Sequence, residues 1–403
     1  RSMLNNKNLR NDVDTIINKL ILDINPYDST SKCLADLKLN DGKNILICIG
    51  KAAWQMGKAV SDNIHIDTGA IITKYGYSNG CIDNLVVFEA GHPIVDENSI
   101  KASEYVLSIT ENLEKNDNVI FCVSGGGSAL FEKPQIPLNK LQKINDELIK
   151  SGASINEINT IRKRLSNVKA GRFAIHCNCH INAIILSDVV GDDLSSIASG
   201  PVFADTSTCK EANDIVNKYN IEIDDEIKQL LNNETPKQIN NVSSYIVSSV
   251  KQLCLKIAYI CKELGYQTEI IQDDCTDSVE MIANKFEQLS KQIKPNFAYI
   301  IGGESVVKVN GKGIGGRNSH LALLCSKFIN DEDMCMFAFG SDGSDGPTDA
   351  AGGYVDINTK KLINVDEYLN NFDSYNALQK IGGLIKTGPT GSNVNDVYVL
   401  MKK

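Results

Sequence analysis

Apolar runs of strand length alternate with amphipathic segments along almost the whole chain. In the first part of the chain, the apolar runs cover residues 44–50, 70–73, 85–90, 118–125 and 182–188. These runs are continuously apolar, which indicates strands buried on both faces, as in a parallel sheet covered by helices. The segments between them, such as 52–64 and 97–113, have the apolar spacing of helices. The pattern predicts an α/β fold.

The alternation is interrupted once, which predicts two domains. Residues 138–172 are expected to be wholly helical, and residues 232–241 are polar, contain a proline and are typical of a linker. After this segment, further strands are predicted at 244–249, 268–273, 297–303 and 335–340. A chain of 403 residues is long enough for two cores. We therefore expect a Rossmann-like N-terminal domain over residues 1–238 and a second α/β domain over residues 239–403.

Composition and charge exclude several classes of protein. The formal net charge is -9 and no run of Lys and Arg is longer than Arg162 to Arg164, which argues against a nucleic-acid or anionic membrane surface. No apolar run approaches the roughly 20 residues of a membrane span, and no signal-peptide pattern is seen at the start. The twelve cysteines are scattered, several within apolar strands, which suits reduced, buried thiols. We expect a cytoplasmic protein.

One cluster of potential zinc ligands has the wrong spacing for a zinc site. His176, Cys177, Cys179 and His180 stand within five residues, where they can rarely all reach one tetrahedral ion, and no second ligand pair is evident. Buried cysteines and histidines at the end of a helix are the simpler interpretation.

Glycine-rich turns follow several predicted strands. In doubly wound sheets, ligands bind at the carboxyl ends of strands, where glycine lets backbone amides approach an anion. The segment Ser124, Gly125, Gly126, Gly127, Ser128 offers successive amides and two hydroxyls, which is a good cradle for a phosphate or a carboxylate. A Walker A sequence is absent, so a P-loop protein is excluded.

Cations are placed where they would meet an anion. Lys51 follows a buried strand directly and is badly placed for solvation, so we expect it to face an anion. Arg317 begins a predicted helix, where its guanidinium could bind phosphate oxygens in a bidentate manner. The cations Arg162 and Lys169 lie on a predicted helix and turn between two strands, and they could hold a substrate carboxylate.

The stretch SDGSDGPTDAAGG, residues 341–353, contains three aspartates: Asp342, Asp345 and Asp349. The EF-hand pattern is not met, so a calcium loop of this type is excluded. Because Asp342 follows a strand directly, these carboxylates could bind Mg²⁺, bind substrate hydroxyls, or simply form a structural turn. Glu304 follows another strand and is a further candidate for substrate binding.

A dinucleotide motif is present but in an unfavourable context. Gly311, Gly313 and Gly316 satisfy G-x-G-x-x-G before a predicted helix. The preceding segment, SVVKV, is predicted as a strand but carries a lysine. It leads into Asn310-Gly311, which favours a hairpin turn instead of a buried strand-to-helix turn. A nicotinamide site here stays the weaker alternative.

Several motifs, taken together, resemble the class II glycerate 2-kinases, whose C-terminal module is the MOFRL domain. In chain order they are GKAA, SGGGSAL, NTIRKRLSNVKAGR, SDVVGDDLSSIASGP, GGES, GIGGRN, GSDGSDGPTDAAG and TGPTGSNVND. They extend from Gly50 to Asp396 and so cover most of the chain. The resemblance places the MOFRL region at about residues 297–400. Some members of this family are named hydroxypyruvate reductase.

The resemblance implies an activity and roles for residues. It implies phosphorylation of D-glycerate to 2-phosphoglycerate by ATP with Mg²⁺, in a cleft between two α/β domains. Lys51 and Arg317 match the family's cations near the transferred phosphate. Asp188 or Asp192 matches its essential acid, and both are candidate metal ligands.

The sequence departs from the family pattern after GGRN, where Ser319 and His320 replace Gln and Glu. The change removes an acid near Arg317 and puts in doubt any metal or substrate contact there. Three alternatives therefore stay open: a kinase of a related hydroxy acid, an NAD(P)H-dependent hydroxypyruvate reductase, and a catalytically silent relative. The sequence also leaves open whether the chain forms a homodimer.

Overall fold

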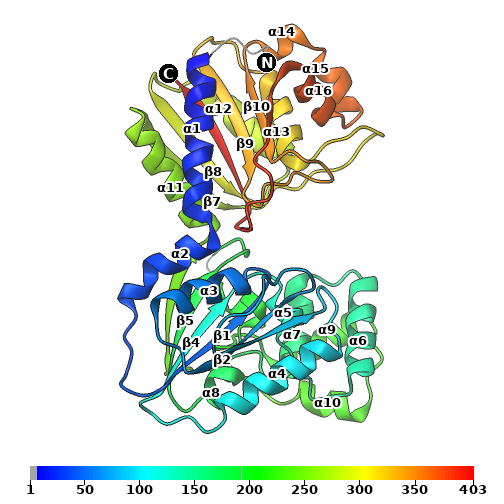
Figure 1. The fold of residues 1–403 in the computed structure, drawn as a ribbon. Helices are drawn as coiled ribbons and strands as arrows, with labels where there is room; N and C mark the ends of the chain where they lie inside the picture. The colour runs from blue at the N-terminus through cyan, green and yellow to red at the C-terminus, as the bar shows by residue number, and fades with distance from the viewer. Residues whose placement is uncertain (1–6, 192) are drawn as a thin grey trace. The chain divides into compact units, whose positions relative to one another are not determined.

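The computed structural model describes residues 7–191 and 193–403, which form two compact units. The N-terminal unit consists of residues 29–187 and 193–247, and the C-terminal unit consists of residues 7–28, 188–191 and 248–403. Each unit contains one six-stranded sheet with helices (Figure 1). The predicted α/β class is therefore confirmed in both units.

The sheet of the N-terminal unit has the strand order β3-β2-β1-β4-β5-β6. Its strands are β1 (Asn44–Ile49), β2 (Thr68–Lys74), β3 (Leu85–Ala90), β4 (Asn118–Val123), β5 (His180–Leu186) and β6 (Val242–Ser248). The pairs β1–β2, β2–β3, β1–β4 and β4–β5 are parallel, as the continuously apolar runs predicted. The order reverses between β1 and β4, and ligands of doubly wound sheets bind at such a reversal.

Helices of two kinds surround this sheet. Those directly connected to its strands are α3 (Ala53–Asn63), α4 (Glu97–Thr110), α5 (Gly127–Leu130) and α8 (Arg172–His176). Helix α4 begins at a capping box, in which Asp96 accepts the N–H of Ser99 and the Ser99 hydroxyl approaches the N–H of Asp96. Short helices also precede β1 and follow β5: α2 (Pro26–Cys33), η1 (Leu34–Asp36) and η2 (Leu194–Ser199).

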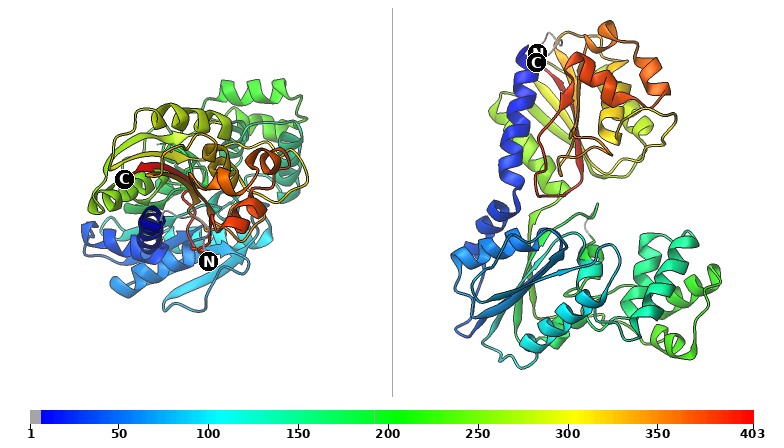
Figure 2. Two further views of the ribbon diagram at one scale, coloured as in Figure 1. Left: turned by 90° about the horizontal axis from the view of Figure 1, so that it is seen from above. Right: turned by 45° about the vertical axis from the view of Figure 1, so that its right-hand side comes forward.

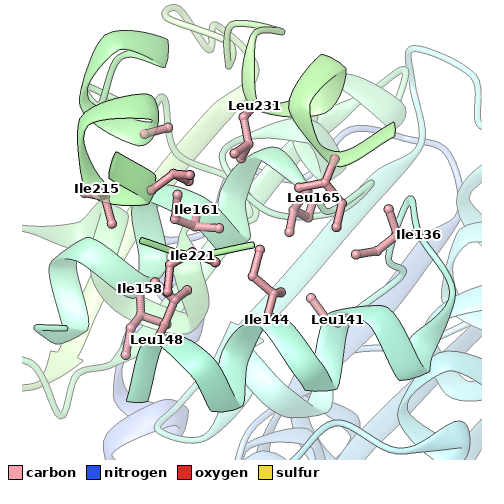
Figure 3. Packing of buried hydrophobic residues seen from close by; sticks show 13 residues of the cluster. Ile136, Leu141, Ile144, Leu148, Ile158, Ile161, Leu165, Ile215, Ile221 and Leu231 are labelled. Carbon is pink, nitrogen blue, oxygen red and sulfur yellow. The ribbon is translucent and has the colours of Figure 1, made fainter. Parts of the chain in front are cut away.

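A separate group of helices lies to one side of the sheet (Figure 2). It comprises α6 (Leu138–Lys150), α7 (Ile155–Arg164), α9 (Cys209–Lys218) and α10 (Asp225–Leu231). Their apolar faces meet in a core of their own, shown in Figure 3, to which Leu141, Ile161 and Leu231 contribute fully buried side chains. This core fixes α7, and α7 carries the cationic segment that begins at Arg162.

The sheet of the C-terminal unit is mixed, with the order β11-β10-β9-β12-β8-β7. Its strands are β7 (Gln267–Cys275), β8 (Phe297–Gly303), β9 (Met334–Gly340), β10 (Gly352–Asp356), β11 (Leu384–Ile385) and β12 (Asp396–Lys402). Only β7–β8 is parallel among the strand pairs of this sheet, and the others are antiparallel. The predicted α/β domain is present, and the connection 341–351 is too short for a crossover, so it joins β9 to β10 as antiparallel neighbours.

Helices cover both faces of this sheet (Figure 2). They are α1 (Lys7–Ile24), α11 (Val250–Glu263), α12 (Val279–Ser290), α13 (Arg317–Ser326), α14 (Thr359–Leu362), α15 (Val365–Asn370) and α16 (Ser374–Ile381). Helix α1 contacts α11 and β9, and α13 packs on β9 and β10. In α1 the buried residues Leu9, Val13 and Leu20 recur at helical spacing, which explains why this face joins the core.

Two predicted elements are absent at the predicted places. The segment SVVKV makes an isolated bridge at Val306 but no strand. Residues 138–172 are not one helical stretch, because a loop separates α7 from α8. In that loop, Ala170 and Gly171 adopt positive φ angles of 58° and 80°, which end helical geometry.

The compact units differ from the predicted domains in two places. Helix α1 was assigned to the N-terminal domain, but it belongs to the C-terminal unit, as does the segment Asp188–Gly191. The chain passes from one unit to the other at Val247, close to the predicted boundary after residue 238. The apolar periodicity of α1 identifies it as a helix but cannot tell which sheet it covers.

All twelve cysteines are free thiols and most are buried, as expected. Within the described part of the chain, no helix is long and apolar enough to cross a membrane.

Arg10 anchors α1 to the C-terminal sheet, and this predicts a measurable loss of stability in Arg10→Ala. Its guanidinium donates to the carbonyls of Gly382 and Leu384, and it lies 5.0 Å from the centre of the Tyr354 ring. Charged hydrogen bonds of this kind stabilise by about 1–3 kcal/mol. Urea unfolding should therefore show a loss of that order. Lys19→Ala removes only an exposed ion pair with Glu263 and should cost less than about 1 kcal/mol.

Candidate active site

The carboxyl ends of β1 and β4 approach each other very closely. A β-carbon on Gly50, whose φ is 117°, would lie 2.2 Å from Ser124 Oγ and 2.6 Å from the Ser124 carbonyl oxygen. Only glycine fits, because of both the φ angle and the lack of space. The Lys51 N–H donates to the Gly125 carbonyl at 2.8 Å, which joins the two strand ends into one rigid turn.

This contact corrects the predicted role of Ser124. Its side chain is buried, its hydroxyl donates to the Ile49 carbonyl at 3.3 Å, and it accepts the N–H of Ala52 at 3.1 Å. The hydroxyl is therefore used to join the two strand ends and does not face a ligand. The sequence indicates a hydroxyl at the end of β4. It does not indicate that the end of β1 buries this hydroxyl.

The glycines after Ser124 keep part of the predicted anion cradle. Gly126 has a φ of 92° and precedes α5, and Gly127 is buried against Ala198. Among the described residues, the N–H groups of Gly126, Gly127 and Ser128 have no acceptor. The Ser128 hydroxyl lies 2.9 Å from that of Ser199. That this segment binds an anion stays a prediction. The N–H groups of Gly126, Gly127 and Ser128 are the donors that would bind it.

Lys51 lies beside Gly126 and His92. A β-carbon built on Gly126 would be 3.3 Å from Lys51 Cγ and 3.4 Å from His92 Nδ1. Lys51 is half-buried and forms no ion pair with any carboxylate of the described residues. Such a cation at the reversal of the strand order suits an anionic ligand.

Two further cations, Lys74 and Arg162, lie near His92. Burial lowers the pKa of His92, and the positive charges of Lys51, Lys74 and Arg162 lower it further. Arg162 donates to the Ser128 carbonyl at 3.2 Å, and its Nε is buried with no hydrogen-bond partner within the described chain. Four basic groups from β1, β2, β3 and α7 therefore gather around the glycine turn after β4. We name Lys51, Lys74, His92 and Arg162 the basic cluster.

Lys169 has a structural role that the sequence did not predict. Its side chain is fully buried, and its ammonium group donates to the carbonyls of Ser128 and Phe131 at 2.5 Å and 3.2 Å. It also lies 3.6 Å from a carboxylate oxygen of Glu132, which is itself buried. Burial lowers the pKa of Lys169 to about 8, against the opposing charge of Glu132. Lys169 therefore positions the turn around Ser128 from inside the protein, and its predicted contact with a substrate carboxylate stays a prediction.

The remaining cations of α7 also hold the structure together. Lys163 lies 3.1 Å from Asp205, and Arg164, which is fully buried, donates to Glu234 at 2.6 Å. Their partners come from the segment after η2 and from the end of the helical group. These ion pairs fix α7 and leave Arg162 as the member of this cationic run that meets the basic cluster.

In the C-terminal unit, Arg317 is held by two carboxylates. Its Nε donates to Asp396 Oδ2 at 2.5 Å, its NH2 to Asp396 Oδ1 at 3.2 Å, and its NH1 to Glu304 Oε1 at 3.2 Å. Asp396 is buried, and burial raises its pKa to about 6 against the effect of Arg317. Asp396 thus fixes the orientation of the guanidinium through a bidentate contact, while Glu304 is about half exposed.

Asp345 is a structural residue at the start of α13. Its two carboxylate oxygens accept the N–H groups of Asn318 and Ser319 at 2.8 Å and 2.9 Å. The side chain is buried, and burial raises its pKa. This corrects its predicted role in substrate binding, because the oxygens face the helix and fill the position that an anion would take.

The other aspartates of this loop are exposed. Asp342 accepts the N–H of Ser344 at 2.9 Å in a local turn, and Asp349 accepts the hydroxyl of Tyr375 at 2.6 Å and lies 3.4 Å from Lys386. Their predicted contacts with a ligand stay predictions. The loop as a whole is the connection between the antiparallel strands β9 and β10.

The predicted acids of SDVVGDD are described only in part. The backbone carbonyl of Asp188 accepts the side-chain amide of Asn395 at 3.2 Å, and Asp192 lies outside the described residues. Their roles as catalytic acid and metal ligands stay predictions. No group of three or more potential metal ligands occurs in the described ranges, and this includes the histidines and cysteines at 176–180.

The positions that depart from the family pattern are internal. Ser319 bonds with the hydroxyl of Ser374 at 2.8 Å, and the His320 ring lies 4.9 Å from the Phe372 ring. Both side chains are buried, and burial lowers the pKa of His320. They pack α13 against α16 and its preceding loop, so the exchange alters an internal packing contact.

Sequence reasoning missed Lys74, His92 and Asp396. Lys74 is the last residue of β2, and His92 follows β3 by two residues. Applying the rule of strand ends to these two strands would have found both. Asp396 was quoted within a motif, but its pairing with Arg317 depends on β12 lying between β8 and β9, which no local pattern predicts.

Known protein families and curated proteins match this chain over most of its length. Residues 12–232 match a domain of unknown function, DUF4147, and residues 297–396 match the MOFRL family. The curated D-glycerate 2-kinase of Thermotoga maritima is 45% identical over 380 residues, which cover 90% of this chain and 91% of that protein. The glycerate 2-kinase of Pyrococcus horikoshii is 39% identical, with 89% and 87% covered.

A solved structure is similar in the same way. The crystal structure of a glycerate kinase from Thermotoga maritima has a TM-score of 0.93 and 41% identity, and the match covers 98% of this chain and 100% of that chain.

The buried pair of Lys169 and Glu132 predicts that substitutions of these two residues have strongly coupled effects on the free energy of unfolding. Lys169→Met leaves the Glu132 carboxylate buried without its cation and should lower the free energy of unfolding by about 3–5 kcal/mol. The double variant Lys169→Met/Glu132→Gln should lose clearly less than the sum of the two single variants in urea unfolding. Lys133→Met, which removes a partly exposed ion pair with Glu104, is the matched control and should have little effect. Additive losses would contradict the coupling.

Proposed function

We propose that this chain, which belongs to the glycerate 2-kinase family with its DUF4147 and MOFRL domains, phosphorylates D-glycerate with ATP to give 2-phosphoglycerate. The basic cluster is the observation that carries the proposal. Lys51, Lys74 and Arg162 meet there without a salt bridge to a carboxylate of the described residues, although Glu132 acts electrostatically on Arg162, at the point where the strand order reverses. Unpaired cations in such a place need an anionic ligand.

Phosphoryl transfer asks little covalent chemistry of the protein. The bond from the γ-phosphorus to the bridging oxygen of ADP breaks, a bond to the glycerate 2-oxygen forms, and the hydroxyl proton leaves to a base. Charge gathers on the equatorial oxygens during transfer, and fixed cations stabilise it. We assign this role to Lys51, supported by the free amides after Ser124, because these groups lie together at one strand end.

Arg317 is proposed as the second cation that acts on phosphate. Asp396 holds its Nε and NH2, so its orientation is set in advance, whereas NH1 contacts only the half-exposed Glu304. Exchange of Glu304 for a phosphate oxygen would keep the bidentate contact with Asp396. Preorganised donors of this kind need no rearrangement during transfer.

Mg²⁺ is proposed as the metal. It usually binds to one or two carboxylates together with substrate phosphates and keeps several waters, so the lack of a larger ligand group in the described chain fits this ion. Asp188 and Asp192 remain the proposed ligands. When bound, Mg²⁺ would neutralise charge on the β- and γ-phosphates.

The reductase alternative is disfavoured by the glycine motif itself. In a dinucleotide site, the pyrophosphate would occupy the N–H groups at the start of the helix. Asp345 occupies those of α13. In addition, β-carbons on Gly311 and Gly313 would clash with the backbone of Asn371 and Asp373, so these glycines serve packing.

The kinase proposal predicts ADP release that depends on D-glycerate and Mg²⁺. Lys51→Ala and Arg317→Ala should each lower kcat by orders of magnitude, because they remove charge that stabilises the transition state. Lys58→Ala and Lys327→Ala, which remove exposed ion pairs of α3 and of the end of α13, are matched controls and should retain activity. Near-normal turnover in Lys51→Ala would contradict the proposal that Lys51 binds the transferred phosphoryl group.

The identity of the product is tested directly. NMR of the product should show phosphorus coupled to the proton at carbon 2. Coupling to the protons at carbon 3 would refute 2-phosphorylation, and oxidation of NADH by hydroxypyruvate without ATP would refute the kinase assignment as a whole.

A further inference from the structure

His92 occupies a place that the glycerate kinase proposal does not use. It follows β3, whereas Lys51 follows β1 and Lys74 ends β2. The strand register aligns these ends, since Ile49 pairs with Ile72 and Lys74 pairs with Ala90. By this register Lys51 is level with Lys74, and His92 lies two residues beyond Ala90, which is the partner of Lys74.

The imidazole of His92 has no partner in the described parts of the chain. Its Nδ1 is buried without a hydrogen bond, and both it and Lys51 lie close to Gly126. A buried polar atom of this kind is costly unless a ligand completes its hydrogen bond. Nδ1 of His92 and Nε of Arg162 are both unpaired in this way, and they belong to the same cluster.

The charged groups near His92 are unbalanced. Lys51, Lys74 and Arg162 bring three positive charges from β1, β2 and α7. The nearest acids along the chain are already engaged: Glu89 accepts the N–H groups of Gly76 and Ser78, and Asp96 caps α4 and accepts the Tyr75 hydroxyl. A single carboxylate would neutralise one charge, whereas a phosphoryl group brings about two.

We propose that the basic cluster is one recognition site for a dianionic phosphoryl group, and that His92 takes up a proton when this group binds. The inference rests on the proposed function for the identity of the natural ligand, the phosphoryl group of 2-phosphoglycerate. Without a ligand, burial and then the neighbouring cations lower the pKa of the imidazole and so favour its neutral form. A bound dianion reverses the sign of the local potential, so it favours the imidazolium.

The sign of the pH dependence follows from this linkage. A ligand that raises the pKa of His92 must bind more tightly as the pH falls through the interval between the raised and the lowered value. Within that interval, affinity should rise by up to about tenfold for each unit of pH, since one proton is involved. Below the lower value, His92 is charged with or without ligand and the dependence ends.

Sulfate is the probe, because its double charge does not change over the useful pH range. We would measure its affinity for the full chain between pH 5 and pH 8 by calorimetry in buffers of different ionisation enthalpy. Proton uptake on binding is expected near neutral pH. His92→Asn, which keeps a polar group near the position of Nδ1 but does not titrate, should bind sulfate without proton uptake. His65→Asn is the matched control, since His65 is exposed and pairs with Asp67.

Two outcomes would overturn the inference. Proton uptake that persists in His92→Asn would assign it elsewhere, provided that the thermal midpoint of the variant is unchanged. Displacement of sulfate by D-glycerate as effective as by 2-phosphoglycerate would show that the cluster recognises a carboxylate.

NMR gives an independent measurement. The chain has only five histidines, so the His92 resonance can be assigned by its loss in His92→Asn. Sulfate should raise the pKa read from this resonance, and Lys74→Met should raise it without ligand. A resonance that sulfate does not move would contradict the proposal.

These results separate the two proposals. Proton-linked sulfate binding without kinase activity would support the site and refute the proposed function, whereas kinase activity without the linkage would refute the role of His92 alone.

Discussion

The close approach of β1 and β4 is the constraint on which the N-terminal site depends. Gly50 leaves no room for a side chain against Ser124, and the Ser124 hydroxyl connects both strand ends. This fixes Lys51 on one side of the turn and Gly126 on the other. Because the strands are parallel, Lys74 ends β2 at the level of Lys51, and His92 follows the end of β3 at the same edge of the sheet. The positions of Lys51 and Gly126 in the candidate site thus depend on the close contact between Gly50 and Ser124.

Elsewhere in the two units, buried cations are paired with carbonyls and carboxylates and so stabilise the fold. Lys169 and Arg164 are fully buried, and their partners are carbonyls and carboxylates of the same unit. Arg317 is similarly held by Asp396. Buried charges need such partners because their desolvation is costly. The basic cluster differs because its cations form no salt bridge among the described residues, and the charge of Glu132 acts on Arg162 alone among them. This contrast distinguishes a binding site from a scaffold.

The sequence predicted the alternation of strands and helices, the parallel N-terminal sheet and the positions of Lys51 and Arg317 at strand and helix ends. These features depend on local apolar patterns and on the rule that ligands meet strand ends. The burial of Ser124, Asp345 and Lys169 could not be predicted, because burial depends on which distant segments pack against a residue. For the same reason, the antiparallel pairing of β12 and its consequence for Arg317 were not accessible from local sequence.

The discontinuity of the C-terminal unit has a consequence for biosynthesis. Helix α1 is synthesised before the N-terminal unit, yet its partners α11 and β9 follow only after that unit has been made. Its apolar face, with Leu9, Val13 and Leu20, must remain uncovered or be shielded by other factors during that time. The last strand, β12, then enters the middle of the sheet. The C-terminal unit can therefore complete its core only after β12 has been synthesised, and α1 is exposed to misassembly throughout that time.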